Sequence, residues 1–239
     1  MDVVEIDPDV VDAAYRFFNV PRDDPRLDVY VMDGRAFLDD APSYDLIVLD
    51  AYSPTYVPFH LMTLEFHSEL NEHLNADGVI VSNLITSLVG DTSELLWSEV
   101  KTVEQVFPNV YLFPTKNILS SLVQNLIMVV HESQDIISDE EASENIMQVI
   151  PDNTRVMRYY DNLYTGEPAV EGIILVDNYA PVDTLLNPVT KTSYERSGRL
   201  NESSFMSQYL LAGLWIISLG AIYIIINSWN RRHSVSSSI

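Results

Sequence analysis

Apolar and polar positions alternate along the first 131 residues with two different spacings. Short apolar runs bounded by turn residues are typical of buried strands, and apolar residues three or four apart are typical of helices. Strands alternating with helices favour an α/β fold with a mostly parallel sheet, and two final strands without a helix between them favour an antiparallel hairpin. The pattern predicts strands at 3–6, 27–32, 46–49, 79–81, 110–113 and 126–130, and helices at 8–18, 36–38, 60–74 and 91–106.

Three of the predicted strands end in an acid or are followed directly by one, namely Glu5, Asp33 and Asp50. The carboxyl ends of parallel strands lie at one edge of a sheet, where open α/β sheets bind their ligands. We therefore expect these three side chains to line a single crevice. Helix capping by Asp33, or by Asp50 at the next element, explains the same residues without a ligand and stays open.

The negative charge of the chain indicates which kinds of molecule it can bind. The formal net charge is −22, which repels phosphate backbones and argues against nucleic-acid binding. Negative potential raises the local concentration of cations, so a small cationic substrate fits. A salt-adapted surface explains the charge equally well, because the chain has 3 Lys against 20 Asp. The absence of Cys excludes disulfides and thiolate chemistry.

The C-terminal part predicts a membrane anchor. No charged residue occurs between Ser203 and Asn230, and the apolar run is long enough to cross a bilayer as a helix. We expect a single-pass membrane protein whose folded domain lies on the cytoplasmic face. The expected organisation is an α/β domain at 1–135, an extension at 136–190, a linker at 191–204, a transmembrane helix at 205–229 and a disordered tail at 230–239.

Four stretches carry a resemblance to a known family. They are VEIDPDVVDAAYRFF, DPRLDVYVMDGRAFL, YDLIVLDAYSP and LMTLEFHSELNEHLNADGVIVSNL. In order and spacing they resemble the spermidine synthase family, the polyamine aminopropyltransferases. The segments PFHLMTLEF and LVDNYAPVD are similar to its membrane-associated, spermidine-synthase-like branch. The resemblance implies the fold of class I S-adenosylmethionine-dependent methyltransferases, a Rossmann-like α/β sheet.

The resemblance also implies an activity and a set of site residues. The family transfers an aminopropyl group from decarboxylated S-adenosylmethionine to an amine such as putrescine, without a metal. By resemblance, Glu5 binds the ribose of the cosubstrate, Asp33 and Gly34 lie beside the adenine, and Asp50 orients and deprotonates the attacking amine. Tyr52 and Ser53, which follow Asp50 directly, are expected to contact the substrate. A homodimer is a further expectation.

Two departures from the family leave alternatives open. Ser53 stands where the family has a second Asp, which favours a methyltransferase acting on another acceptor. The resemblance begins at the second strand of the family fold, so we expect a sheet lacking its first strand and its Gly-rich turn. A truncated start is the favoured explanation, and a degenerate, inactive membrane-tethered scaffold is the other. No metal site is expected, because His60 and His67 are seven residues apart on the predicted helix.

Overall fold

The structure is a computed structural model that describes residues 1–52, 56–115, 121, 123–131, 162–186 and 188. The chain divides into two compact units, and every described residue belongs to the unit formed by Met1–Ile136 and Tyr159–Thr190. Most of the first half of the expected extension, together with the linker and the tail, lies outside the described residues.

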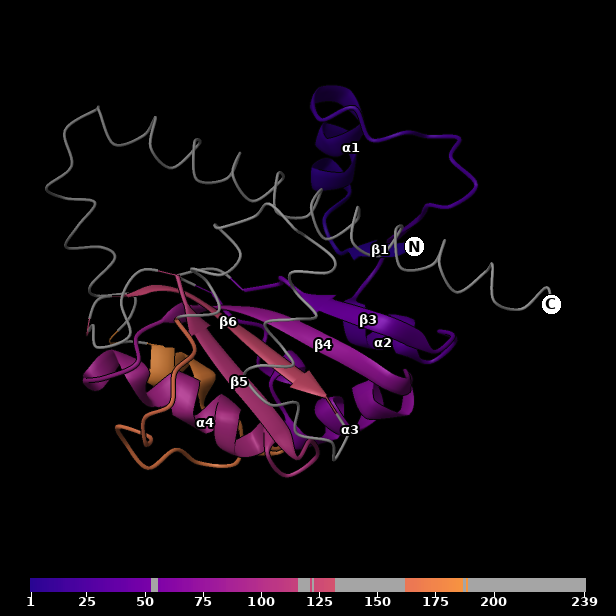
Figure 1. Cartoon of the computed structure of the whole chain (residues 1–239). Coiled ribbons are helices and arrows are strands. Elements are labelled where there is room, and N and C mark those ends of the chain that lie inside the picture. The colour runs from indigo at the N-terminus through magenta and orange to yellow at the C-terminus, as the bar shows by residue number, and fades with distance from the viewer. Residues whose placement is uncertain (53–55, 116–120, 122, 132–161, 187, 189–239) are drawn as a thin grey trace, which may run out of the picture. The chain divides into compact units, whose positions relative to one another are not determined.

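Strands and helices alternate as the hydrophobic pattern predicts (Figure 1). Local chemistry explains the helix starts. The Asp7 carboxylate accepts a hydrogen bond from Asp9 N at 2.8 Å, with Pro8 in the first helical turn. The elements are β1 (Asp2–Glu5), α1 (Pro8–Phe17), β2 (Asp28–Val31), α2 (Gly34–Leu38), β3 (Tyr44–Leu49), the 3-10 helix η1 (Phe59–Leu61), α3 (Leu64–Glu72), β4 (Leu74–Thr86), the 3-10 helix η2 (Asp91–Ser93), α4 (Glu94–Val103), β5 (Asn109–Pro114) and β6 (Gln124–His131).

The strands form two sheets instead of the single sheet expected. β1 and β2 pair in parallel as a two-stranded sheet, and the other four strands have the order β3-β4-β6-β5. β3 and β4 are parallel, whereas β6 is antiparallel to both β4 and β5. The predicted antiparallel hairpin is thereby confirmed. A hydrogen bond of 2.5 Å from the Tyr44 hydroxyl to Asp2 Oδ2 joins the first residues of β3 and β1.

Strand β4 is longer than the pattern predicts. The pattern predicted a strand at 79–81, but β4 begins at Leu74 and runs through 76–78, where Ala-Asp-Gly is a local turn signal in the sequence. The β3–β4 register shifts between Tyr44 and Leu46. Asp77 adopts a left-handed backbone with φ +63°, as an Asp in a turn does. Gly78 is confined, because a Cβ there would lie 2.8 Å from Asn75 O. The local turn signal therefore produces a bulge within a continuous strand, because β3 holds both sides of it.

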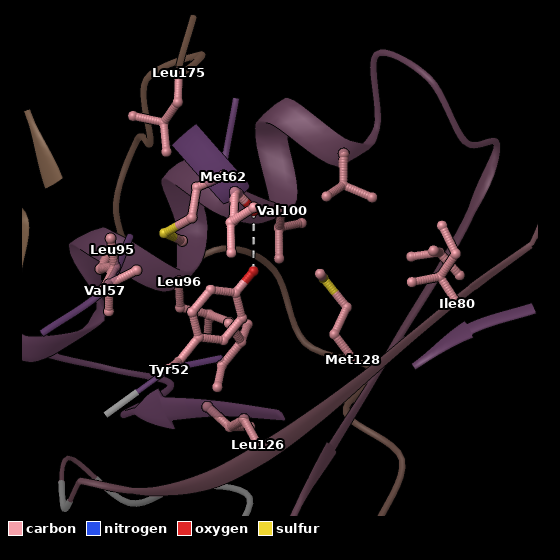
Figure 2. Packing of buried hydrophobic residues seen from close by; sticks show 14 of the residues in the cluster. Tyr52, Val57, Met62, Ile80, Leu95, Leu96, Val100, Leu126, Met128 and Leu175 are labelled. Atoms are coloured by element: carbon pink, nitrogen blue, oxygen red, sulfur yellow. Dashed lines mark hydrogen bonds between the residues drawn. The ribbon is translucent and has the colours of Figure 1, made fainter. Parts of the chain in front are cut away.

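The hydrophobic core lies between the four-stranded sheet and helices α3 and α4 (Figure 2). Met62, Leu96 and Met128 are almost completely buried, and they come from the end of η1, from α4 and from β6. Helix α1 differs, because none of its residues is buried although the pattern gives it an apolar face. Phe17, at its end, is 74% exposed.

Residues 172–186, which we call the docking segment, pack on α3 and α4. The Leu64 amide donates to Leu175 O at 2.8 Å, and the Leu175 amide donates to Thr102 Oγ1 at 2.9 Å. Leu175 and Val182 are buried. At Gly172 a Cβ would lie 2.2 Å from Trp97 O, so only glycine fits this approach. The docking segment is thus part of the folded core.

The expected transmembrane helix at 205–229 is a wrong prediction, and this part of the predicted fold class and the membrane localisation inferred from the helix are corrected. Among the described residues, no helix is long and apolar enough to cross a bilayer. The longest described helices have 10 residues, whereas a span needs about 20. Residues 205–229 themselves lie outside the part that the structure describes.

Candidate active site

Asp50 directly follows β3 and is held by a side chain of the neighbouring strand. β3 and β4 are parallel with Leu49 opposite Ser82, so the next residues, Asp50 and Asn83, lie side by side. Asn83 Nδ2 donates to Asp50 Oδ1 at 2.8 Å. Asn125 of β6 donates in turn to Asn83 Oδ1 at 3.0 Å. Three strands therefore contribute to one line of hydrogen bonds that fixes the carboxylate.

The surroundings of Asp50 alter its acidity. Desolvation by neighbouring protein atoms raises the pKa of Asp50, and the hydrogen bond from Asn83 opposes that rise only in part. The residue is still exposed to solvent, and Oδ2 has no partner among the described residues. A carboxylate with a raised pKa and one free oxygen is suited to accept a proton.

Asp33 caps helix α2 and also contacts a histidine. Its Oδ1 accepts from Arg35 N at 2.9 Å and from Ala36 N at 3.1 Å, and its Oδ2 lies 2.8 Å from His60 Nε2. Partial burial acts to raise the pKa of Asp33, but the hydrogen bonds from Ala36 and His60 outweigh it and lower the pKa. Asp33 is therefore ionised and fixed, and the capping role considered from the sequence is real.

Space is available beside Asp33. A Cβ built on Gly34 would meet no heavy atom within 4 Å, so nothing among the described residues covers this position. A flat group can therefore approach the backbone here. The absence of a side chain at Gly34 leaves the Asp33 carboxylate accessible from that direction.

Glu5 ends β1, in register with Val31 of β2. Its Oε1 accepts from Asp7 N at 2.8 Å, and its Oε2 has no partner among the described residues. Glu5 thus ends one strand of the two-stranded sheet and Asp33 follows the other, whereas Asp50 follows a strand of the other sheet. The structure brings the first two acids to one sheet edge and leaves the third on a separate sheet.

Tyr52 lies in the core, where its hydroxyl donates to Leu61 O at 3.1 Å (Figure 2). Burial, together with the negative charge of Glu99, raises the pKa of Tyr52 well above its usual value. Its role as a substrate contact stays a prediction. Ser53 lies outside the described residues. The enclosed cavity beside Tyr52 has about 10 Å³ of free volume, room for one water at most.

The two histidines considered as metal ligands form separate pairs. His60 pairs with Asp33, while His67 Nε2 lies 2.9 Å from Glu99 Oε1 in the core. Burial raises the pKa of Glu99, and the neighbouring His67 acts against that rise. Glu99 Oε2 is buried without a partner among the described residues. This pair connects α3 to α4. It is buried in the core, unlike the solvent-accessible carboxylates at the strand ends.

Sequence reasoning missed Asn83 and Asn125 beside Asp50 and Arg35 beside Asp33. It also missed Asp177, which accepts hydrogen bonds from the Arg35 guanidinium. A signal existed for Asn83 alone, because an amide side chain interrupts the apolar run of 79–85. The other three depend on contacts between segments far apart in the chain, which no local pattern reveals.

A family model described as "Spermine/spermidine synthase domain" matches residues 1–157, more than half of the chain. The chain belongs to the spermine/spermidine synthase family. The family resemblance found in the sequence is therefore confirmed.

Curated relatives of this family match the same part of the chain. A polyamine aminopropyltransferase of Vibrio vulnificus is 39% identical over 118 residues, which are 47% of this chain and 37% of the relative. A probable polyamine aminopropyl transferase of Bifidobacterium longum is 38% identical over 109 residues, 44% of this chain and 23% of the relative. The chain thus spans well under half the length of these relatives. An N-terminal histidine N-methyltransferase of Emericella nidulans is 36% identical over 120 residues, 46% of this chain and 20% of the relative.

Solved structures show the fold. A probable spermidine synthase from Corynebacterium glutamicum matches with a TM-score of 0.57 and 19% identity, covering 74% of this chain and 63% of that chain. Human methyltransferase-like protein 13 in complex with SAH matches with a TM-score of 0.51 and 23% identity, covering 66% and 76%. The expected class I methyltransferase-like, Rossmann-like fold is confirmed.

Proposed function

We propose that the full protein is an aminopropyltransferase that uses decarboxylated S-adenosylmethionine and a small amine such as putrescine. One observation carries the proposal within this family. Asp50 stands at the carboxyl end of β3 with a raised pKa, one oxygen held by Asn83 and the other without a partner among the described residues. That arrangement suits a base for an attacking amine.

The reaction asks little of the protein besides position and proton transfer. The lone pair of a neutral amine attacks the aminopropyl methylene, a C–N bond forms, and the C–S bond breaks. The electron pair of the C–S bond goes to sulfur, which leaves as a neutral thioether. The proton lost by the new ammonium goes to Asp50 Oδ2. Alignment of amine and methylene supplies most of the acceleration, because the sulfonium is already a good leaving group.

The nucleoside half of the cosubstrate is assigned to the two-stranded sheet. Asp33 accepts a hydrogen bond from the exocyclic amine of adenine, and the open space beside Gly34 lets the flat base approach. Glu5 accepts hydrogen bonds from the ribose hydroxyls through Oε2. The decarboxylated cosubstrate carries a sulfonium and an ammonium group, so the net charge of −22 favours it as well as the amine.

Two residues that lie close after Asp50 in the chain are assigned to the amine. Ser53 is retained as a substrate contact because it follows Asp50 closely in the chain. Tyr52 is also retained as a proposed substrate-binding residue, and its hydroxyl donates a hydrogen bond to Leu61 O. We further propose that residues 1–135 form the catalytic domain, that 136–190 extend it, and that two copies form a homodimer.

A methyltransferase is the second candidate, favoured by the histidine methyltransferase relative of Emericella nidulans. The two functions differ in cosubstrate. A binding titration of the full-length protein with S-adenosylmethionine and with its decarboxylated form separates them, because each function requires tighter binding of its own cosubstrate. An inactive scaffold predicts that neither binds.

The decisive assay measures aminopropyl transfer by the full-length protein to several amines, with Asp50→Asn beside the unaltered protein. Removal of the general base lowers kcat by about 100-fold or more. Asp40→Asn is the matched control, because Asp40 is an exposed acid that precedes β3. Absence of turnover with every amine rejects the activity, and equal turnover by Asp50→Asn rejects the role of Asp50.

A further inference from the structure

Arg35 forms ion pairs with two carboxylates from different parts of the chain. Its guanidinium donates to Glu69 of α3 through Nε at 2.8 Å and Nη2 at 2.6 Å. It also donates to Asp177 of the docking segment through Nη1 at 2.7 Å and Nη2 at 2.9 Å. Both pairs are bidentate, the geometry in which an arginine fork is held most firmly.

Asp177 is itself fixed by the elements around it. Its Oδ1 accepts from Thr63 Oγ1 at 2.7 Å, and its backbone amide donates to Glu65 Oε2 at 3.0 Å. The pKa of Asp177 is lowered, chiefly by the hydrogen bond from Arg35, so the pair stays ionised. The docking segment therefore presents a rigid carboxylate to Arg35, 142 positions away in the chain.

Arg35 transmits this constraint to Asp33. Its amide donates to Asp33 Oδ1, and the Arg35 guanidinium also donates to His60 O at 3.3 Å. The His60 ring contacts Asp33 Oδ2. Fixing the arginine thus fixes both residues that surround the Asp33 carboxylate.

The consequence for Asp33 follows from counting its acceptor sites. A carboxylate has about four lone-pair sites. Arg35 N and Ala36 N use Oδ1, and His60 uses one site of Oδ2. One lone pair of Oδ2 remains free, and its direction is fixed because the three donors hold the carboxylate in place. A donor on a ligand must come from that direction.

We propose that Asp177, acting through Arg35, is a positioning residue that sets the direction in which Asp33 accepts the exocyclic amine of adenine. The inference rests on the proposed function, which assigns the adenine to Asp33. It adds a role for the docking segment, which would make the nucleoside site selective for adenine over bases that lack the amine.

The test compares two nucleosides on the full-length protein by calorimetry. The probes are 5′-methylthioadenosine and 5′-methylthioinosine, in which a carbonyl oxygen replaces the amine. The unaltered protein prefers the adenosine by about tenfold or more, because the inosine loses a hydrogen bond to a charged group. In Asp177→Asn the ratio of the two dissociation constants falls at least threefold. Asp183→Asn is the control, an exposed acid of the same segment, and it keeps the ratio.

The ratio separates positioning from a purely structural role. A merely structural role, or a general loss of negative charge, weakens both nucleosides alike and leaves the ratio unchanged, which overturns the inference. Arg35→Lys keeps the charge but loses the bidentate fork, so it also lowers the ratio. If the unaltered protein binds neither nucleoside, or binds both equally, the assignment of adenine to Asp33 fails and the inference fails with it. An unchanged ratio in Asp177→Asn, with selective binding by the unaltered protein, overturns the inference alone.

Discussion

Replacement of Asn83 by alanine tests how Asp50 is held. Asn83 is 6% exposed and donates to Asp50 at 2.8 Å, and this hydrogen bond favours the charged carboxylate. A hydrogen bond to a charged group contributes about 1.5–3 kcal/mol, and the exposure of Asp50 reduces this to about 1 kcal/mol. The acid dissociation constant of Asp50 therefore falls about fivefold in Asn83→Ala.

Loss of the Asn83 side chain raises the pKa of Asp50 further. Burial already raises the pKa of Asp50, and loss of the amide donor removes the one contribution that opposes the rise. The titration of the Asp50 carboxyl carbon, followed by NMR, moves to higher pH in the variant. The acidic limb of the pH–rate profile moves the same way, because the base must be ionised to accept a proton.

The chain offers a matched control at the other end of the same strand pair. Asn75 of β4 donates to Asp45 of β3 at 2.9 Å, the same amide–carboxylate contact on an exposed surface. Asn75→Ala leaves the titration of Asp50 unchanged. An unshifted Asp50 titration in folded Asn83→Ala would refute the reasoning, because the contact would then contribute nothing to the charged state.

Two further predictions concern stability. His67→Ala leaves the fully buried Glu99 without its partner, which lies 2.9 Å away. The free energy of unfolding, measured in urea, falls by about 3–5 kcal/mol. A fall of less than about 1 kcal/mol contradicts a buried ion pair. Gly172→Ala forces a Cβ to 2.2 Å from Trp97 O and lowers the free energy of unfolding by at least about 1–3 kcal/mol. In Gly166→Ala the Cβ meets the far end of the Tyr164 side chain, which can move, so the loss of stability is smaller. Equal melting temperatures for the two glycine variants would show that the docking segment is not held against α4.

Local signals predicted the ends of elements well where a capping, turn or charged residue marks the end. Pro8 after Asp7 predicted the start of α1, and the apolar run before Asp50 predicted the end of β3 at Leu49. The local turn signal at 76–78 gives a bulge in β4, because pairing with β3 overrides the local preference. The apolar face of α1 predicted burial that does not occur among the described residues, since periodicity reveals a face and not what covers it.

The candidate site was predicted in part. Glu5, Asp33, Gly34 and Asp50 could be chosen because their position relative to predicted strands is a local property. The burial of Tyr52 could not be predicted, because a tyrosine after a strand can point into a groove or into the core with equal ease. The partner of each acid was also hidden, since hydrogen bonds such as Asn83 to Asp50 join residues of different elements.

The sequence by itself determined the alternation of strands and helices and the acids at strand ends, because both depend on neighbours within a few residues. It also determined the strong negative charge, which is a sum over the composition. Tertiary structure alone decided that β1 and β2 form their own sheet, that Asn83 holds Asp50, and that Asp177 grips Arg35. The physical reason is that spacing along a chain dictates which face a side chain occupies, whereas the partner it meets there depends on how distant segments pack.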